Sequence, residues 1–122
     1  MKKVLIVEDN QFLAKVLDVK MKKAGFETKI ARNGQEVFPM LGAFKADIII
    51  LDLILPKKDG FEVLKELKAS DAYKNIPVLV TTNLSQPEDK ERTKRLGAVD
   101  YIVKSDISIR DIVDKVNTYA TH

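Results

Sequence analysis

Residues 48–60 of the chain read IIILDLILPKKDG. A carboxylate, Asp52, interrupts an aliphatic run, and a proline, two lysines and an Asp-Gly pair follow it. An unpaired carboxylate in an apolar interior is costly. Asp52 therefore either breaks a core segment or lies where a buried strand emerges into solvent. Pro56 and Gly60, which are typical of turns, favour a strand that ends at Asp52 and leads into a helix capped by Asp59.

Aliphatic runs of this kind recur along the chain. Between them, apolar residues recur at steps of three and four, which is the spacing of a helix with one buried face. Uninterrupted alternation of strand and helix predicts an α/β fold, with helices on both faces of a parallel sheet and right-handed crossovers. We expect five strands, at residues 2–8, 26–31, 46–52, 76–82 and 99–104.

Residues typical of helix ends agree with this alternation. Gly25 and Gly97 follow expected helix ends, where a glycine adopts a left-handed conformation easily. Ser85 precedes Gln-Pro-Glu and is a candidate N-cap for the fourth helix, and Ser108 is one for the last helix.

Pro39 breaks the pattern. It is about the sixth residue of the second expected helix, in residues 33–44, NGQEVFPMLGAF. Proline inside a regular helix costs ~3 kcal/mol, because it removes a hydrogen bond and crowds the preceding turn. We expect this helix to be short, kinked or partly 3₁₀.

Length and composition predict one domain, residues 1–122, of a soluble globular protein with 45% hydrophobic and 32% charged residues. The absence of cysteine excludes disulfides and Cys-ligated metals. We see no signal peptide and no apolar run long enough to cross a membrane, so we expect a cytoplasmic protein. The net charge of +3 comes from lysines scattered over helical segments, which indicates solvated helix faces rather than a nucleic-acid surface.

Polar side chains follow the strands at one edge of the expected sheet. The first strand ends in Glu8 and Asp9, the third in Asp52, the fourth in Thr82 and the fifth in Lys104. Ligands bind beyond the carboxyl ends of the strands in open parallel sheets. In the strand order 2-1-3-4-5 the first and third strands are neighbours, so the three carboxylates converge.

Three neighbouring carboxylates repel one another, and a divalent cation relieves this repulsion. Mg²⁺ prefers oxygen ligands, whereas zinc would need histidine or cysteine, and neither is nearby. With the metal, the ammonium of Lys104 and the hydroxyl of Thr82 would neutralise and orient a phosphoryl group. Asp52 would then be the nucleophile that forms an acyl phosphate.

These residues resemble the receiver domain of two-component response regulators, of the chemotaxis-regulator type. The resemblance covers nearly the whole chain. It implies a flavodoxin-like, doubly wound (βα)5 fold with a parallel five-stranded sheet in the order 2-1-3-4-5. The matching segments are LIVEDN, LDLILPKKDG, IPVLVTT and LGAVDYIVK, at residues 5–10, 51–60, 76–82 and 96–104.

The resemblance assigns a role to each metal-site residue. Asp52 is the expected phosphoacceptor. Asp9 is the expected direct ligand of Mg²⁺, Glu8 acts largely through water, and the backbone carbonyl of Ile54 supplies a further ligand.

The resemblance also implies a switch. Lys104 would contact the phosphoryl oxygens, Thr82 would move toward them, and Tyr101 would follow it inward. Thr82 is preferred to Thr81 because it lies five residues after Pro77, as the family's residue usually does.

The implied function is a signalling switch rather than an enzyme acting on a separate substrate. A histidine kinase or phosphotransfer protein would dock mainly on the first helix and donate the phosphoryl group. The face made by the fourth helix, the fifth strand and the fifth helix would then change its binding of a downstream protein, and it could also form a homodimer.

Two departures from the family pattern leave an alternative open. Ser105 replaces the usual proline after the lysine, so we expect a trans peptide there, and Asn83 replaces a small residue. A degenerate receiver that binds partners without phosphorylation is the second hypothesis. The apolar side chains of Ile54 and Leu84 cannot orient an attacking water, which predicts a long-lived acyl phosphate.

A third hypothesis is a flavodoxin-like cofactor binder or a small hydrolase. A flavin-phosphate site needs a Gly/Ser/Thr-rich loop after the first strand. This chain has EDNQF there, whose carboxylates would repel a free phosphate, and no residue beyond the assigned carboxylates could act as a base for hydrolysis.

Overall fold

A computed structural model describes residues 1–120 of the chain. Strands and helices alternate through this part of the chain, as the sequence predicts. The elements are β1 (Lys3–Val7), α1 (Gln11–Lys23), β2 (Glu27–Ala31), α2 (Val37–Ala43), β3 (Ile48–Leu51), α3 (Gly60–Ala69), β4 (Val78–Thr82), α4 (Pro87–Arg95), β5 (Asp100–Val103), the 3₁₀ turn η1 (Lys104–Asp106) and α5 (Ile109–Ala120).

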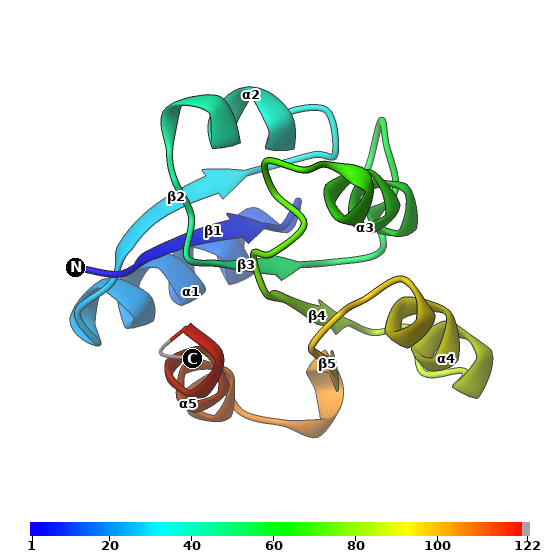
Figure 1. Cartoon of the computed structure of the whole chain (residues 1–122). Helices are drawn as coiled ribbons and strands as arrows, with labels where there is room; N and C mark the ends of the chain where they lie inside the picture. Colours follow the sequence, from blue (N-terminus) through cyan, green and yellow to red (C-terminus); the bar gives the residue numbers. More distant parts are fainter. Residues whose placement is uncertain (121–122) are drawn as a thin grey trace.

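The strands form one parallel sheet in the order β2-β1-β3-β4-β5, which confirms the expected fold class and topology. Successive side chains of a strand point to opposite faces, so each strand contributes to two cores. Leu5 and Val7 pack in the core that includes residues of α2 and α3, whereas Val4 and Ile6 pack in the core with α1 and α5. Figure 1 shows α1 and α5 on one side of the sheet and α2 and α3 on the other.

Most of the predicted helix ends are confirmed. The Asp59 side chain accepts a hydrogen bond from the backbone N–H of Glu62, and Ser108 exchanges hydrogen bonds with Asp111 in the first turn of α5. Gly25 and Gly97 follow α1 and α4 with φ of 98° and 103°, the left-handed conformation that favours glycine.

The predicted cap at Ser85 is wrong by one position. Gln86 is the N-cap residue of α4, and its side chain makes no capping hydrogen bond. Pro87 is the first helical residue, where its fixed φ and missing N–H suit a helix start. Proline therefore determines this helix start, and the serine hydroxyl does not.

The helix that contains Pro39 is short, as predicted, but an interior proline is not the reason. The helix α2 is short, with seven residues, but it begins at Val37, so Pro39 is its third residue. The first N–H groups of a helix have no acceptor inside it. Pro39 therefore removes no helical hydrogen bond, and the penalty of an interior proline does not apply.

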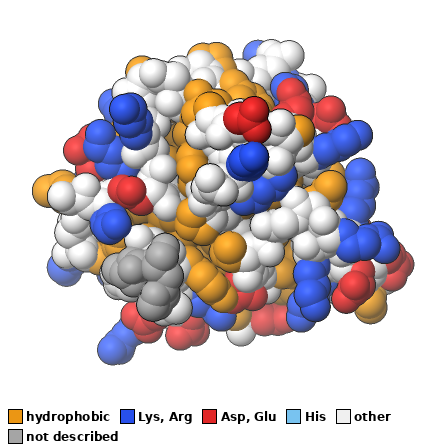
Figure 2. Space-filling view, viewed as in Figure 1, with side chains coloured by type: hydrophobic (Ala, Val, Ile, Leu, Met, Phe, Trp, Pro, Cys, Tyr) orange, Lys and Arg blue, Asp and Glu red, His pale blue; other side chains and the backbone are white. Residues whose placement is uncertain are grey.

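The surface mixes charges of both signs. Figure 2 shows lysines and arginines interspersed with aspartates and glutamates on the face in view. Among residues 1–120, no helix combines the length and the apolar character that crossing a membrane requires.

Candidate functional site

The register of the sheet brings the acidic residues together. Val7 of β1 pairs with Leu51 of β3, so the next residues, Glu8 and Asp52, leave the sheet side by side. The N–H of Asp52 donates to the carbonyl of Val7, and that of Glu8 donates to the carbonyl of Ala31. Both acidic residues are thus fixed by backbone hydrogen bonds that continue the strand pairing.

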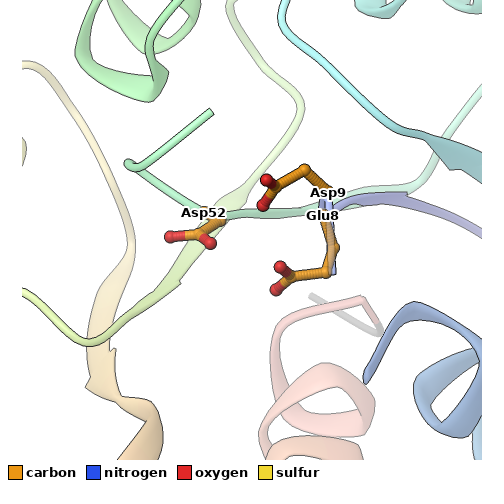
Figure 3. A group of neighbouring side chains, drawn as sticks. All are labelled: Glu8, Asp9 and Asp52. Atoms are coloured by element: carbon orange, nitrogen blue, oxygen red, sulfur yellow. The ribbon is translucent and has the colours of Figure 1, made fainter. Parts of the chain in front are cut away.

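Carboxylate oxygens of Glu8, Asp9 and Asp52 lie within 4.8 Å of one another. Figure 3 shows Glu8 and Asp9 at the end of β1 and Asp52 at the end of β3. Glu8 and Asp52 are buried, with 2% and 4% of their surface exposed, whereas Asp9 is exposed. The cluster therefore consists of two buried carboxylates and one carboxylate that is open to solvent.

Among residues 1–120, Lys104 is the lysine that forms ion pairs with this cluster. Lys104 follows β5, which is separated from β3 by β4, and its long side chain spans that gap. Its Nζ lies 2.6 Å from Glu8 Oε1 and 2.8 Å from Asp52 Oδ2, and only 15% of its side chain is exposed. The peptide bond that follows Lys104 is trans, as expected for Ser105.

The electrostatics reflect this crowding. Burial raises the pKa of Glu8, and the Asp52 carboxylate raises it further, although Lys104 opposes the effect. Burial alone would lower the pKa of Lys104, but its hydrogen bonds to Asp52 and Glu8 outweigh burial and raise that pKa. The ammonium thus stays charged and partly compensates the carboxylates, which leaves an excess of negative charge.

The loop between β3 and α3 shapes the other side of Asp52. The N–H of Ile54 donates to Asp52 Oδ1 at 3.2 Å, while the Ile54 side chain is 55% exposed. Asp52 therefore uses one oxygen for its own loop and the other for Lys104. This arrangement holds Ile54 beside the cluster.

The expected switch residues meet at a shared partner. Thr82 is fully buried, and its hydroxyl accepts the N–H of Leu84 at 3.4 Å. The hydroxyl of the half-buried Tyr101 donates to the carbonyl of Leu84 at 2.5 Å. Burial raises the pKa of Tyr101, with smaller contributions from the charges of Asp89 and Asp52.

Two contacts of the site were not predicted from the sequence. The ion pair between Lys104 and Glu8 depends on side-chain conformations that residue spacing does not encode. Leu84 accepts the hydrogen bond from Tyr101 through its backbone carbonyl, so the identity of its side chain could not predict this contact. The sequence did predict that Leu84 lies beside the site.

The donor set suits a hard divalent cation. Glu8, Asp9 and Asp52 supply only oxygen atoms, and Mg²⁺ is commonly held by one or two carboxylates together with waters and a phosphate oxygen. The excess negative charge left by one lysine among three carboxylates also favours a cation. The three carboxylates could therefore hold a metal ion.

Comparison with known proteins agrees with this geometry. The chain is 35% identical over 118 residues to the polar-differentiation response regulator DivK of Brucella anthropi, covering 97% of this chain and 95% of that protein. The receiver domain of Francisella response regulator 1452 superposes with a TM-score of 0.91 at 28% identity, covering 99% of this chain and 98% of that one. The Mn²⁺-bound form of response regulator Rcp1 superposes with a TM-score of 0.84 at 29% identity, covering 98% and 94%.

The family model for the response regulator receiver domain matches residues 4–117, which is almost the entire chain. The sheet order and the acidic cluster described above lie inside this matched region. The chain therefore belongs to the response regulator receiver domain family, the phosphorylation-dependent switches of two-component signalling.

Proposed function

We propose that residues 1–122 act as one receiver domain that takes a phosphoryl group onto Asp52 in a Mg²⁺-dependent reaction. The donor is the phosphohistidine of a histidine kinase or a phosphotransfer protein. The observation that supports this most strongly is the placement of Asp52. One of its oxygens lies 2.8 Å from the Lys104 ammonium. Carboxylate oxygens of Asp52, Glu8 and Asp9 also lie within 4.8 Å of one another.

In the proposed reaction, a carboxylate oxygen of Asp52 attacks the phosphorus atom of the phosphohistidine. The P–O bond of the acyl phosphate forms as the P–N bond breaks, and the histidine nitrogen leaves with the electron pair of that bond. Lys104 lies where it can stabilise negative charge on the phosphoryl oxygens. Because Asp52 is nearly buried, the exposed Asp9 marks the side from which we expect the donor to approach.

Asp9, Asp52 and the backbone carbonyl of Ile54 would hold the Mg²⁺ ion, with Glu8 acting through water. The bound cation would offset charge on the phosphoryl oxygens and so lower the barrier to transfer. The Mn²⁺-bound form of response regulator Rcp1, whose fold is similar, supports a divalent cation in this kind of fold.

The readout we propose starts at Thr82. A phosphoryl group on Asp52 would draw the Thr82 hydroxyl away from the N–H of Leu84, which it now accepts. Because Tyr101 is bonded to the carbonyl of the same Leu84, its ring would respond to that movement. The altered face would comprise α4, β5 and α5, and it would bind a downstream protein or a second copy of the chain.

The lifetime of the acyl phosphate follows from its neighbours. The apolar side chains of Ile54 and Leu84 offer no group that could orient a water for hydrolysis. We therefore propose a long-lived phosphorylated state. Hydrolysis within seconds in the purified protein would contradict this part of the proposal.

Intact-protein mass spectrometry tests the phosphoacceptor directly. Incubation with acetyl phosphate and MgCl₂ should add the mass of one phosphoryl group to the wild-type chain, and chelation of the metal should prevent the addition. Asp52→Asn should abolish it. Asp71→Asn is the matched control, because the Asp71 side chain is 98% exposed, and it should react like the wild type.

An equal mass gain in Asp52→Asn would overturn the assignment of Asp52. A wild-type chain that neither binds Mg²⁺ nor gains mass would favour the alternative, a degenerate receiver that acts through partner binding alone. The departures at Ser105 and Asn83 motivate that alternative, whereas the complete acidic cluster opposes it.

A further inference from the structure

Gly34 lies in the loop between β2 and α2, which contributes no side chain to the acidic cluster. Its backbone is nevertheless pressed against the loop that begins at Asp52. A Cβ atom placed on Gly34 would lie 2.0 Å from the carbonyl oxygen of Lys58 and 2.7 Å from its Cβ. The N–H of Gly34 also donates to the carbonyl of Pro56 at 3.5 Å.

The need for glycine at this position is steric. The φ angle of Gly34 lies outside the left-handed range, unlike those of Gly25 and Gly97. An alanine could therefore adopt the backbone conformation, but it could not fit without moving the backbone of Lys58. Gly42 offers a contrast within the same region, because a Cβ there would meet nothing within 4 Å.

Backbone hydrogen bonds within the loop from Asp52 to Gly60 would pass a shift of Lys58 on to the residues after Asp52. The N–H of Lys58 donates to the carbonyl of Pro56 at 2.8 Å, around Lys57 with φ of 70°. At its end, the N–H of Gly60 donates to the carbonyl of Leu53 at 2.9 Å. These short-range bonds tie the position of Lys58 to that of the residues directly after Asp52.

The Lys58 side chain fixes the loop from the opposite direction. Its ammonium lies 2.9 Å from Glu66 Oε2 on α3 and 5.5 Å from the centre of the Phe38 ring on α2. Side-chain contacts thus draw Lys58 toward the two helices, while the backbone of Gly34 limits how far the loop can move. The loop is held in one place between them.

We propose that Gly34 is a positioning residue for the divalent cation. Its bare backbone sets the position of the loop after Asp52, and hence the place of the Ile54 carbonyl among the cation's ligands. This inference rests on the proposed metal site, and it adds a residue that neither touches the cation nor carries a charge. Groups that orient metal ligands typically change metal affinity when they are altered, although they make no bond to the metal.

The test is isothermal titration of MgCl₂ into the wild type and two variants, at a temperature where circular dichroism shows all three folded. Gly34→Ala should weaken Mg²⁺ binding about tenfold or more. Gly42→Ala, the matched control, should bind Mg²⁺ as the wild type does. Thermal melts record the stability of each variant separately.

A second readout separates positioning from a loss of stability. If Gly34 acts through the cation, the rate of phosphorylation by acetyl phosphate in Gly34→Ala should fall at low Mg²⁺ and return to the wild-type rate at saturating Mg²⁺. A lower melting temperature with unchanged Mg²⁺ affinity would overturn the proposal. So would a rate that stays low at saturating Mg²⁺, since that result would assign the effect to Asp52.

If Gly34→Ala does not fold, Lys58→Ala replaces it. This variant removes the contacts of Lys58 with Glu66 and Phe38 but leaves Gly34 in place, and it should weaken Mg²⁺ binding in the same direction. Unchanged Mg²⁺ affinity in Lys58→Ala would then overturn the proposal. A wild-type chain without measurable Mg²⁺ binding would instead remove the proposed metal site itself, and the inference with it.

Discussion

Lys104 governs the charge balance of the acidic cluster. Its ammonium is shared between the buried carboxylates of Glu8 and Asp52, and no other lysine or arginine among residues 1–120 forms an ion pair with either of them. Breaking a buried ion pair by removing one partner leaves an uncompensated charge and is strongly destabilising. The same ammonium therefore compensates the buried carboxylates in the absence of metal, and it is the group that we propose to contact a phosphoryl group.

Replacing Lys104 with methionine separates these two effects. In the absence of metal, Lys104→Met should lower the free energy of unfolding by about 3 kcal/mol, because two buried carboxylates lose their partner. Added Mg²⁺ should then raise the melting temperature of the variant more than that of the wild type, since the cation takes over the lost charge. Thermal melts with and without MgCl₂ measure both quantities.

Lys74→Met provides the control for this experiment. Lys74 pairs with Asp71 at the surface, where such pairs contribute about 0–1 kcal/mol. It should change neither the stability nor the response to Mg²⁺ appreciably. An equal Mg²⁺ shift in Lys104→Met and the wild type would contradict the idea that lysine and metal compensate the same charges.

Which polar side chains lie close together could be predicted from the sequence, because the ends of the aliphatic runs show where strands end. Glu8, Asp52 and Lys104 each follow an aliphatic run, and a parallel sheet places all such ends at one edge. Thr82, at the end of its own strand, was predicted in the same way, whereas Tyr101 came only from the resemblance to receiver domains. Their shared bonds to Leu84 could not be predicted, because those bonds depend on how the backbone of the loop after β4 turns.

Among the elements, α2 shows that the effect of a proline on helix stability depends on its position in the helix. We expected Pro39 to be about the sixth residue of a helix within residues 33–44, which would place it in the helix interior. The side chain of Asn33 instead accepts the N–H groups of Gln35 and Glu36, which turns the chain before the helix starts. Local hydrogen bonds of asparagine compete with helical ones in this manner.

Pro39→Ala tests the corrected position. Because the N–H of residue 39 has no helical acceptor in the first turn, the substitution should change the free energy of unfolding by less than about 1 kcal/mol. An interior proline would instead cost ~3 kcal/mol, so its removal would stabilise the protein by a similar amount. Urea denaturation distinguishes the two, and a gain near the larger figure would contradict the observed helix start.

Gly42→Ala calibrates this measurement within the same helix. A glycine inside a helix is less favourable than alanine by about 0.5–1 kcal/mol, and nothing crowds this position. The control should therefore show a small gain in stability.

The existence and order of the elements followed from the sequence, whereas the ends of the strands did not. The strands are shorter than predicted by one or two residues at most ends, as with β3, which spans Ile48–Leu51 rather than residues 46–52. Backbone hydrogen bonds continue the strand pairing at Glu8 and Asp52, just beyond the strands, so residue type does not mark where a strand ends. The helix ends marked by Gly25, Gly97 and Asp59 were right because each has a specific backbone or hydrogen-bonding role.

Across the whole molecule, the helices differ in how many apolar side chains they bury against the sheet. Three large apolar side chains of α3, those of Val63, Leu64 and Leu67, are fully buried, whereas Thr93 is the only buried residue of α4. Besides the burial of Thr93, α4 contacts α3 through the Arg92 guanidinium, which lies 4.1 Å from the centre of the Phe61 ring. Regions with few buried apolar contacts open at lower free energy than the core.

Amide hydrogen exchange should reveal this difference. The amides of α4 should exchange about tenfold or more faster than the central amides of α3 under native conditions. Such lability suits an element of the face that we propose to change on phosphorylation. Equal protection of the two helices would contradict a loosely held α4.

We propose above that Asp52 accepts a phosphoryl group within the acidic cluster. Sodium borohydride reduces an aspartyl phosphate to homoserine, which peptide mass spectrometry locates by residue. After treatment with acetyl phosphate and MgCl₂, we predict homoserine at position 52 in the wild type and none when the metal is chelated. Reduction at another carboxylate, or at none despite bound Mg²⁺, would contradict the account.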